Sequence, residues 1–258
     1  MNFCYYVFNI LKTLGRLKYI CVYPKTLPIT NCELCNPLDN PKSIVSWNIQ
    51  GLFLFMNPLK TENILRELHY FTEDIICLQE VFENPLKERI IEGLKDKYPY
   101  YLTGNRNKRF WVGEDCGLLV LSKYKVQFVK EVILDEYVFP DTMANKSVLY
   151  FRIGCRNFVT THLQSSNMND AEDIAIRQIK IVMNESPFKE YIITGDLNHP
   201  EAHLHIGCPK SIHKNTCNNE ILDYIVPINL PNLAMDIGVS DIDITEVSDH
   251  YPLIGRIQ

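Results

Sequence analysis

The sequence predicts an α/β fold for residues 43 to 258, and three features of this stretch support the prediction. Short apolar runs of strand length alternate with segments whose apolar residues recur at helical spacing. Polar side chains stand directly after several of these runs. The stretch contains no internal repeat and no low-complexity tract. One layered domain of sheets and helices accounts for these features.

The first part of this domain alternates strands with helices. Residues 44–47 and 75–78 are short apolar runs rich in β-branched side chains, which favours buried strands. After each run, apolar residues three and four positions apart predict a helix. The expected buried faces are Ile64, Leu65, Leu68 and Phe71 in the first helix and Leu86, Ile90 and Leu94 in the second.

The second part is richer in strands. Four apolar runs in close succession predict strands at residues 118–121, 126–134, 148–153 and 158–161. A third helix is expected next, with Ile174, Ile179, Val182 and Met183 on its buried face. The last expected strands are residues 191–194, 221–226 and 253–257. Many strands and few helices are therefore expected in the domain.

Residues 1–42 form a separate N-terminal part. Residues 1–23 are apolar and aromatic, and their charged residues are all basic: Lys12, Arg16 and Lys18. Either a basic amphipathic helix on an anionic membrane surface or an element packed on the domain explains this pattern. Residues 24–42 contain four prolines and predict an irregular connector. A secretory signal would have positive charge before its apolar stretch and a cleavage site of small residues after it, and neither is clear here.

The composition excludes some classes of protein. The chain has 258 residues, and no apolar run reaches the ~18 residues that a transmembrane helix needs. Its net charge of −5 argues against a protein that holds nucleic acid mainly by neutralising phosphates, although a nuclease remains open. Residues 1–42 carry a net charge of +3, so residues 43–258 carry −8. Excess acid is compatible with binding of a divalent cation or with a solubilising surface.

The nine cysteines make a poor disulfide framework, because their number is odd and several lie in apolar runs. They predict a reducing, intracellular location, in the cytoplasm or at a membrane surface. Cys32 and Cys35 form a Cys-x-x-Cys pair that could bind zinc or carry out redox chemistry. A second open alternative is a zinc site in the loop at residues 199–217, where helix and strand signals vanish. Its candidate ligands are His199, His203, His205, Cys208, His213 and Cys217.

Polar residues cluster where the expected strands end or begin. Any one of them could be a cap or a turn residue, but the carboxyl ends of strands converge on one edge of a sheet. These residues are Asn48, Glu80, His162, Asp196, Asn198, Asp223, Asp249 and His250. Together they predict an active site of carboxylates, carboxamides and imidazoles.

These side chains suit hydrolysis of a phosphoester. Glu80 and Asn48 offer oxygen ligands, which favours magnesium over zinc. His250 can accept a proton near neutral pH if a carboxylate orients its ring, which would activate water to attack phosphorus. This chemistry requires no serine or cysteine nucleophile.

Six motifs resemble, in order, the endonuclease/exonuclease/phosphatase superfamily. They are Ser46-Trp-Asn48-Ile-Gln, Leu78-Gln-Glu80-Val, Thr161-His162-Leu-Gln, Gly195-Asp196-Leu-Asn198, Leu222-Asp223-Tyr-Ile and Ser248-Asp249-His250-Tyr-Pro-Leu. The resemblance implies a deoxyribonuclease-like four-layer α/β sandwich of two packed mixed sheets flanked by helices. It also implies phosphoester hydrolysis with magnesium, or with manganese as the alternative.

The resemblance implies a role for each residue of the motifs. Glu80, Asn48 and Asp249 would hold or lie beside the metal, and Asp223 would orient His250. His162 would donate to the phosphate oxygens, and Asn198 would stabilise the charge on phosphorus. Asp196 would hold or help deprotonate the water, so either Asp196 or His250 could be the base.

Further details resemble the sphingomyelinase C branch. They include Leu-Gln-Glu80-Val-Phe, Cys116-Gly-Leu-Leu-Val-Leu-Ser-Lys123 and Asn145-Lys146-Ser147. The resemblance implies a phospholipid substrate and a phosphate contact from Lys146, whose alternative interpretation is a solvated surface lysine. Ser147 departs from the glycine usual in that branch, and the segments on either side of Asp223 are short.

Other substrates and roles remain open. A nuclease of the same fold would need a basic, aromatic surface, for which residues 106–111 are the candidate. An inositol phosphatase shares Gly-Asp-Leu-Asn, but Leu-Asp-Tyr-Ile departs from its usual Cys-Asp-Arg. An inactive scaffold would be expected to lack some of the site residues, and this chain has them all.

Overall fold

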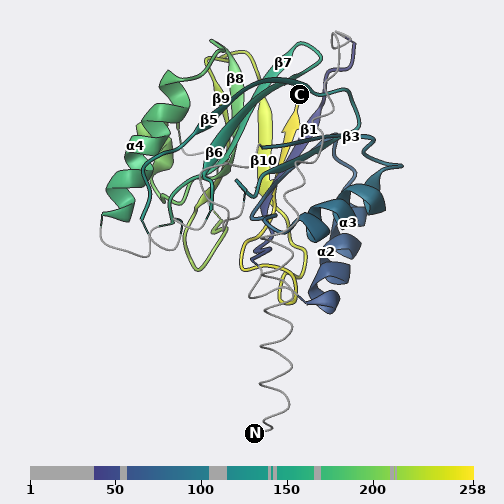
Figure 1. Ribbon diagram of the computed structural model, residues 1–258. Coiled ribbons are helices and arrows are strands. Elements are labelled where there is room, and N and C mark those ends of the chain that lie inside the picture. The colour runs from purple at the N-terminus through teal and green to yellow at the C-terminus, as the bar shows by residue number, and fades with distance from the viewer. Residues whose placement is uncertain are drawn as a thin grey trace, which may run out of the picture.

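The computed structural model describes residues 38–52, 57–104, 115–138, 141, 144–165, 170–209, 212 and 214–258. These residues form two mixed sheets that pack face to face, with helices on their outer sides (Figure 1). The predicted four-layer α/β sandwich is therefore confirmed. The expected boundary between residues 42 and 43 stays a prediction, because residues 1–37 lie outside the described residues.

The first sheet has the strand order β10-β11-β1-β2-β4-β3. The bounds of these strands are β1 Ser43–Asn48, β2 Ile75–Gln79, β3 Tyr100–Thr103, β4 Leu119–Ser122, β10 Met235–Val239 and β11 Leu253–Ile257. β1 and β2 are parallel, and helix α2 (Pro58–Tyr70) makes the crossover that a parallel pair requires. The other neighbours are antiparallel. Helix α3 (Asn84–Leu94) follows β2 and packs beside α2.

The second sheet has the order β5-β6-β7-β8-β9. The bounds are β5 Gln127–Ile133, β6 Ser147–Ile153, β7 Arg156–His162, β8 Tyr191–Asp196 and β9 Asp223–Ile228. β7 and β8 are its parallel pair, and helix α4 (Ala171–Asn184) makes their crossover. The short helix α5 (Ala202–Ile206) packs beside α4. Each sheet thus contains one β-α-β unit, and the crossover helices α2 and α4 lie on the outer faces of the two sheets (Figure 1).

Three apolar cores hold the four layers together. Adjacent residues of a strand point to opposite faces, so Val45 packs against α2 and α3 while Ile44 packs between the sheets. In the same way Leu149 faces the other sheet while Tyr150 faces α4. The central strands are apolar on both faces because both faces are buried.

Two strands and one helix were missed by the sequence analysis. β3 and β10 are the two edges of the first sheet, and edge strands need fewer apolar residues than central ones. The segment at 199–217 was expected to lack helix or strand, which is wrong because α5 lies within it. Its five residues are too few to show a helical period, and Gly207, at φ 77°, ends the helix.

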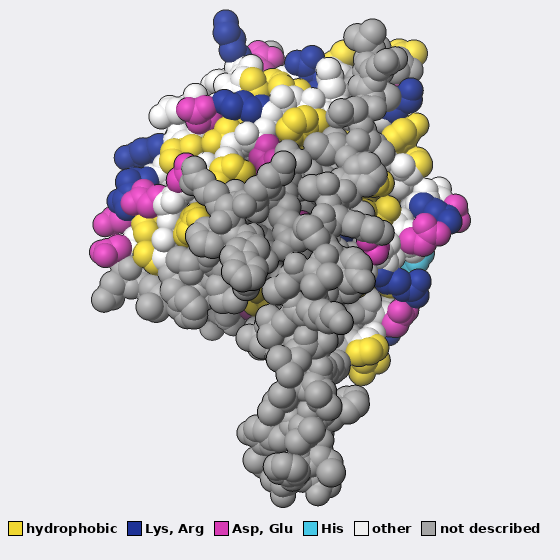
Figure 2. Space-filling model, viewed as in Figure 1, with side chains coloured by type: hydrophobic (Ala, Val, Ile, Leu, Met, Phe, Trp, Pro, Cys, Tyr) yellow, Lys and Arg dark blue, Asp and Glu magenta, His cyan; other side chains and the backbone are white. Residues whose placement is uncertain are grey.

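The described end of the connector packs on the second sheet. The side-chain oxygen of Asn40 accepts a hydrogen bond from the backbone N–H of Cys155, at 2.8 Å, and Pro41 O accepts from the Arg156 guanidinium, at 2.6 Å. No helix among the described residues is long and apolar enough to cross a membrane. On the described part of the face in Figure 2, basic and acidic side chains lie interspersed.

Candidate active site

The predicted site residues meet at one edge of the two sheets. Asn48 ends β1 and Glu80 follows β2, while His162 and Asp196 end β7 and β8. β9 and β11 run antiparallel to their neighbours, so the residues at or before their first positions reach the same edge. These residues are Asp223, Asp249 and His250. The antiparallel pairing thus explains why these three precede strands rather than follow them.

Asn48 joins the two sheets at the centre of the site. Its amide donates to Glu80 Oε1 at 3.1 Å and to Asp196 Oδ2 at 3.0 Å. Its Oδ1 accepts from the backbone N–H of Gln50 at 3.0 Å. The side chains of Asn48 and Asp196 are almost fully buried. One carboxamide therefore fixes carboxylates from both sheets.

Glu80 is the carboxylate with an unused oxygen. Its Oε2 is buried and has no hydrogen-bond partner. Burial raises the pKa of Glu80, against the hydrogen bond from Asn48 and the charge of Lys146. A buried carboxylate with an orphaned oxygen is costly unless a cation balances it. Together with Asn48 Oδ1 and the exposed Asp249 carboxylate, it makes an oxygen donor set that fits a hard divalent cation.

Tight backbone contacts hold this edge in place. Glu80 and Asn198 have positive φ angles of 58° and 49°. Gly195 has φ 141°, and a Cβ there would lie 2.0 Å from Thr161 O. A side chain at position 195 would therefore push β7 and β8 apart just before Asp196. Strained backbone of this kind is common at functional sites.

His250 has two differently placed ring nitrogens. Nδ1 lies 2.8 Å from Asp223 Oδ2, and Nε2 lies 3.8 Å from Asp196 Oδ2 and 4.0 Å from Asp249 Oδ1. The backbone oxygen of His250 accepts from Trp47 Nε1 at 2.9 Å. Trp47 is fully buried in the first core, so the residue carrying the imidazole is anchored to the sheet.

The buried carboxylates of Asp196 and Asp223 and the imidazole of His250 shift one another's pKa values. Burial lowers the pKa of His250, but the charges of Asp223 and Asp196 outweigh burial and leave it above the usual value. Burial, followed by repulsion from Asp223, raises the pKa of Asp196 to about 7. The arrangement therefore keeps a proton within the Asp196, Asp223 and His250 group near neutral pH.

Lys146 and His162 form a buried pair beside this group. The Lys146 ammonium donates to His162 Nε2 at 3.0 Å and to Leu163 O at 2.8 Å, and it lies 3.2 Å from Asp141 Oδ1. Its side chain is 0% exposed, so the interpretation as a solvated surface lysine is wrong. These three partners use its three hydrogens. Burial and the charge of Lys146 hold the pKa of His162 well below its usual value, so the ring is neutral.

Asn198 bonds to the same backbone carbonyl as Lys146, that of Leu163. Its amide donates to Leu163 O at 3.0 Å, and its backbone N–H donates to Asp196 Oδ1 at 2.9 Å. Leu163 O thus accepts from both Asn198 and Lys146. This shared acceptor ties the residues after β7 to those after β8.

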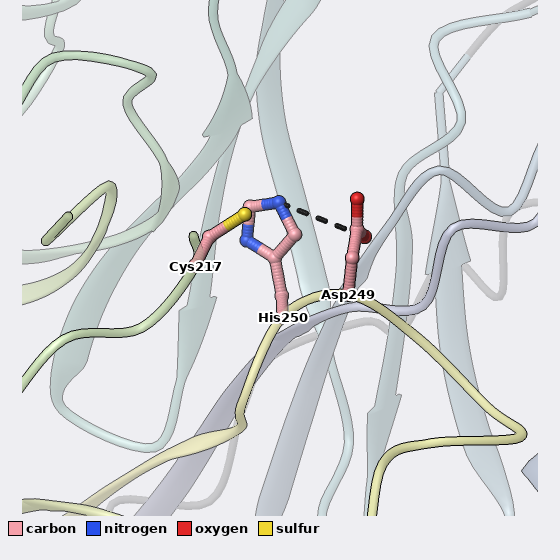
Figure 3. A group of neighbouring side chains, drawn as sticks. All are labelled: Cys217, Asp249 and His250. Atoms are coloured by element: carbon pink, nitrogen blue, oxygen red, sulfur yellow. Dashed lines mark ion pairs between the residues drawn. The ribbon is translucent and has the colours of Figure 1, made fainter. Parts of the chain in front are cut away.

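The sequence analysis missed three features of the site, for which no local signal exists. Lys60 of α2 donates to Gln50 O at 2.8 Å, and burial lowers its pKa against the attraction of Asp249 and Glu80. Cys217 pairs with His250 in an isolated antiparallel bridge. Figure 3 shows its thiol beside the imidazole ring. Both contacts depend on the tertiary fold.

The third missed feature is a buried ion pair between Lys87 of α3 and Asp115. Asp115 Oδ1 also accepts from Gly117 N at 2.8 Å, and Gly117 O accepts from Val81 N at 2.8 Å. The backbone oxygen of Asp115 accepts from Asn145 N at 3.2 Å. Asp115 thus connects the residue after Glu80 with the residue before Lys146.

The zinc alternatives receive little support from the described residues. Within the segment at 199–217, His199 contacts the ring of His205 and lies 3.4 Å from Glu172, and Cys217 alone among its described members belongs to a group of three metal-ligand side chains. His213, the Cys32 and Cys35 pair and the candidate nucleic-acid patch at 106–111 lie outside the described residues.

The sequence is similar to a known protein family and to characterised members of it. A family model described as Endonuclease/Exonuclease/phosphatase family matches residues 45–250. Sphingomyelinase C of Bacillus cereus is 25% identical over 152 residues, which are 49% of this chain and 46% of that protein. Tyrosyl-DNA phosphodiesterase 2 of Mus musculus is 29% identical over 174 residues, which are 63% of this chain and 43% of that protein.

The fold is also found in solved structures. A beta toxin from Staphylococcus aureus with bound magnesium ions has a TM-score of 0.68 at 19% identity, covering 85% of this chain and 100% of that chain. At this identity the likeness concerns the fold. The chain spans about half the length of the curated relatives that it matches first.

Proposed function

The chain belongs to the endonuclease/exonuclease/phosphatase family, as its resemblance predicted, and from this premise we propose that it is a magnesium-dependent phosphodiesterase. The observation that carries the proposal is the convergence of Asn48, Glu80, Asp196 and the Asp223–His250 pair at one sheet edge. An oxygen donor set and an imidazole oriented by a carboxylate are the parts that hydrolysis of a phosphoester requires.

The proposed metal site is Asn48, Glu80 and Asp249. The unpartnered oxygen of Glu80 supports this assignment. Mg²⁺ held there would polarise a phosphoryl oxygen and neutralise charge that develops during attack. The beta toxin structure, which has bound magnesium ions, supports the choice of metal, and manganese remains the alternative.

We assign activation of water to the Asp196, Asp223 and His250 group. Asp223 accepts from Nδ1 and so leaves Nε2, which faces Asp196, to take the proton of the water. Because Asp196 and His250 titrate as a coupled pair, the proton is assigned to the group rather than to one residue.

The remaining residues would contact the phosphate. The free hydrogen of the Asn198 amide would donate to an equatorial oxygen. His162 Nε2 is placed at the same edge, 3.7 Å from Glu80 Oε1 and from Asp196 Oδ2. Because Nε2 accepts from Lys146 in the neutral ring, His162 would donate to the phosphate only after Nε2 is protonated. The three hydrogens of the Lys146 ammonium are used by His162, Leu163 and Asp141. Lys146 would therefore act through His162 as a positioning residue, which modifies the direct phosphate contact expected from the sequence.

For the substrate we propose a membrane phospholipid with a phosphodiester head group, as in a sphingomyelinase. The similarity to Bacillus cereus sphingomyelinase C supports this class. Membrane contact through residues 1–23 lies outside the described residues. It stays a prediction, and unchanged vesicle binding after deletion of residues 1–24 would contradict it.

A nucleic-acid substrate is the second candidate. The similarity to tyrosyl-DNA phosphodiesterase 2 favours it, because that match covers more of this chain at higher identity. The same site residues would serve, since both substrates are phosphodiesters.

The test assays the purified chain on sphingomyelin vesicles and, in parallel, on DNA and on a 5′-tyrosyl oligonucleotide, with Mg²⁺ or with chelator. His250→Ala is the site variant and His69→Ala, an exposed histidine at the end of α2, is the matched control. We expect chelator-sensitive phosphocholine release that His69→Ala retains and His250→Ala loses by roughly 10²- to 10⁴-fold.

Each alternative outcome has a distinct meaning. Cleavage of DNA or the tyrosyl oligonucleotide without lipid turnover would move the assignment to the nucleic-acid candidate. Full Mg²⁺-dependent activity in His250→Ala would contradict the mechanism for either substrate.

A further inference from the structure

A thiol lies beside the imidazole that the proposed reaction uses. Cys217 and His250 form an isolated antiparallel bridge, and the backbone N–H of Tyr251 donates to Thr216 O at 2.8 Å. Cys217 N–H in turn donates to Glu220 O at 3.1 Å, which closes a tight turn around the cysteine. These backbone contacts fix the thiol next to the ring. Cys217 is 5% exposed.

Cys217, His250 and Asp249 have the composition of a metal site. Each offers one ligand atom, and these atoms all lie within 4.8 Å of one another. Figure 3 shows the three side chains approaching one another from two segments of the chain. Hydrolysis by activated water needs no thiol, so the proposed function leaves Cys217 without a role.

We propose that Cys217, His250 and Asp249 form a second metal site, selective for a soft transition-metal ion such as Zn²⁺, whose occupation blocks hydrolysis. The proposal rests on the proposed function, because the metal would take the imidazole nitrogen assigned to water activation. It differs from the magnesium site in its ligands and shares Asp249 with it.

Ligand chemistry separates the two sites. Thiolate and imidazole favour Zn²⁺, and carboxamide and carboxylate oxygens favour Mg²⁺. The Cys217 site supplies one sulfur, one nitrogen and one oxygen, whereas Asn48 and Glu80 supply oxygen alone. Three protein ligands leave a fourth tetrahedral position open.

The outer contacts of the imidazole also fit a metal ligand. A histidine bound to metal usually donates its other ring N–H to a carboxylate, which fixes the ring orientation. His250 has this partner, because Nδ1 lies 2.8 Å from Asp223 Oδ2 and Asp223 is fully buried. Nε2 lies 4.0 Å from Asp249 Oδ1 and becomes a metal ligand once its proton has left. On binding, the thiol proton and the proton kept by the Asp196, Asp223 and His250 group are released to solvent, and no bond is oxidised.

Inhibition follows from the shared nitrogen. While a metal ion occupies His250 Nε2, that nitrogen cannot take a proton from water. Zinc is therefore expected to inhibit the Mg²⁺-dependent reaction, and excess Mg²⁺ should relieve inhibition weakly because the ions compete at Asp249 alone.

The experiment uses Co²⁺ as a spectroscopic probe and Zn²⁺ as the inhibitor. All proteins carry Cys32→Ser and Cys35→Ser, so that the Cys-x-x-Cys pair contributes no thiolate. On that background Cys217→Ser is compared with Cys208→Ser, a matched change at a half-buried thiol after α5. We expect a thiolate-to-cobalt absorption band that Zn²⁺ abolishes, present in the background protein and in Cys208→Ser and absent in Cys217→Ser.

The affinity for Zn²⁺ and its inhibition should change together. Loss of an outer partner typically weakens metal binding 10- to 100-fold, so loss of the thiolate itself should weaken Zn²⁺ binding at least tenfold. The Zn²⁺ concentration for half-inhibition should rise by a similar factor in Cys217→Ser and stay unchanged in Cys208→Ser. Thermal melts check folding, and Cys217→Ala replaces the serine variant if that variant is unfolded.

The outcomes separate this inference from the proposed function. A missing band in the background protein, or a band and an inhibition that Cys217→Ser leaves unchanged, would overturn the zinc site while Mg²⁺-dependent hydrolysis stands. A band that depends on Cys217 in a protein that hydrolyses none of the phosphodiesters would support the metal site and overturn both the proposed function and its inhibition by zinc.

Discussion

At the scale of single residues, the Asp223–His250 pair is the feature on which the proposed activation of water depends. Asp223 is fully buried, and its Oδ1 has no hydrogen-bond partner in the described structure. Its charge is therefore balanced mainly through Oδ2 and the ring of His250. The charge holds the imidazole in the tautomer that leaves Nε2 free to accept a proton.

Replacing Asp223→Asn should remove this orientation without changing the size of the side chain. An amide can donate to the ring as well as accept from it, so the wrong tautomer becomes populated. We expect kcat to fall by roughly 10²- to 10⁴-fold with little change in KM, measured by steady-state kinetics.

Asp236→Asn, an exposed position on β10, is the control and should leave kcat unchanged. A change confined to KM in Asp223→Asn would contradict the assigned role.

At the scale of elements, an ion pair connects helix α3 to the segment that precedes strand β4. Lys87 is 1% exposed although it lies on a helix, and its partner Asp115 precedes the buried residues Cys116 and Gly117. Hydrogen bonds from the Asp115 junction reach the backbone of Val81, directly after Glu80. The pair thus supports Glu80, the proposed metal ligand, which lies outside any helix or strand.

Lys87→Met should therefore destabilise the protein and weaken Mg²⁺ binding. Removing one partner of a buried ion pair costs about 3–5 kcal/mol, because the other charge stays buried and unpaired. Chemical denaturation measures the free energy of unfolding, and a magnesium titration of the rate measures the binding.

Lys95→Met is the matched control. It breaks an ion pair with Glu92 whose two side chains are 57% and 68% exposed, and exposed pairs contribute little to stability because water and salt screen them. Equal effects of the two substitutions, or a normal magnesium dependence in Lys87→Met, would contradict the supporting role of Lys87.

At the scale of the whole molecule, the site lies where two sheets meet. Glu80 follows a strand of the first sheet and Asp196 ends a strand of the second, and Asn48 bonds both. The core between the sheets sets their relative position, so the site forms when both sheets have packed. A cation bound by the first sheet beside the second should stabilise the folded protein relative to the unfolded chain.

Magnesium should therefore raise the melting temperature. A ligand at 100 times its dissociation constant stabilises the folded state by about 2.7 kcal/mol, which corresponds to roughly 5–10 °C in a protein of this size. Differential scanning calorimetry with Mg²⁺ and with chelator measures the shift.

Glu80→Gln should abolish most of the shift, because an amide neutralises the carboxylate and keeps its shape. Glu92→Gln, an exposed substitution, should retain it. If the melting temperature of the unsubstituted protein is the same with Mg²⁺ and with chelator, the proposed metal site is contradicted, whatever activity the protein has.

The sequence by itself determined the central part of this fold. The apolar runs that became β1, β2, β4 and β6–β8 are buried on both faces, and hydrophobic burial leaves a signal that can be read locally along the chain. The same runs placed Asn48, Glu80, His162 and Asp196 at strand ends. The edge strands β3 and β10 escaped detection because half-buried strands leave weak patterns.

Tertiary structure alone decided which side chains touch. The bond between Trp47 and the backbone of His250 spans 203 positions, and the bond between Asn48 and Asp196 spans 148. No local pattern encodes such contacts, since they depend on how two sheets pack. For the same reason the burial of Lys146 and the position of Cys217 beside His250 emerged from the structure. Burial also set the charges of the site, because desolvation acts on a carboxylate or an imidazole once the surrounding layers exclude water.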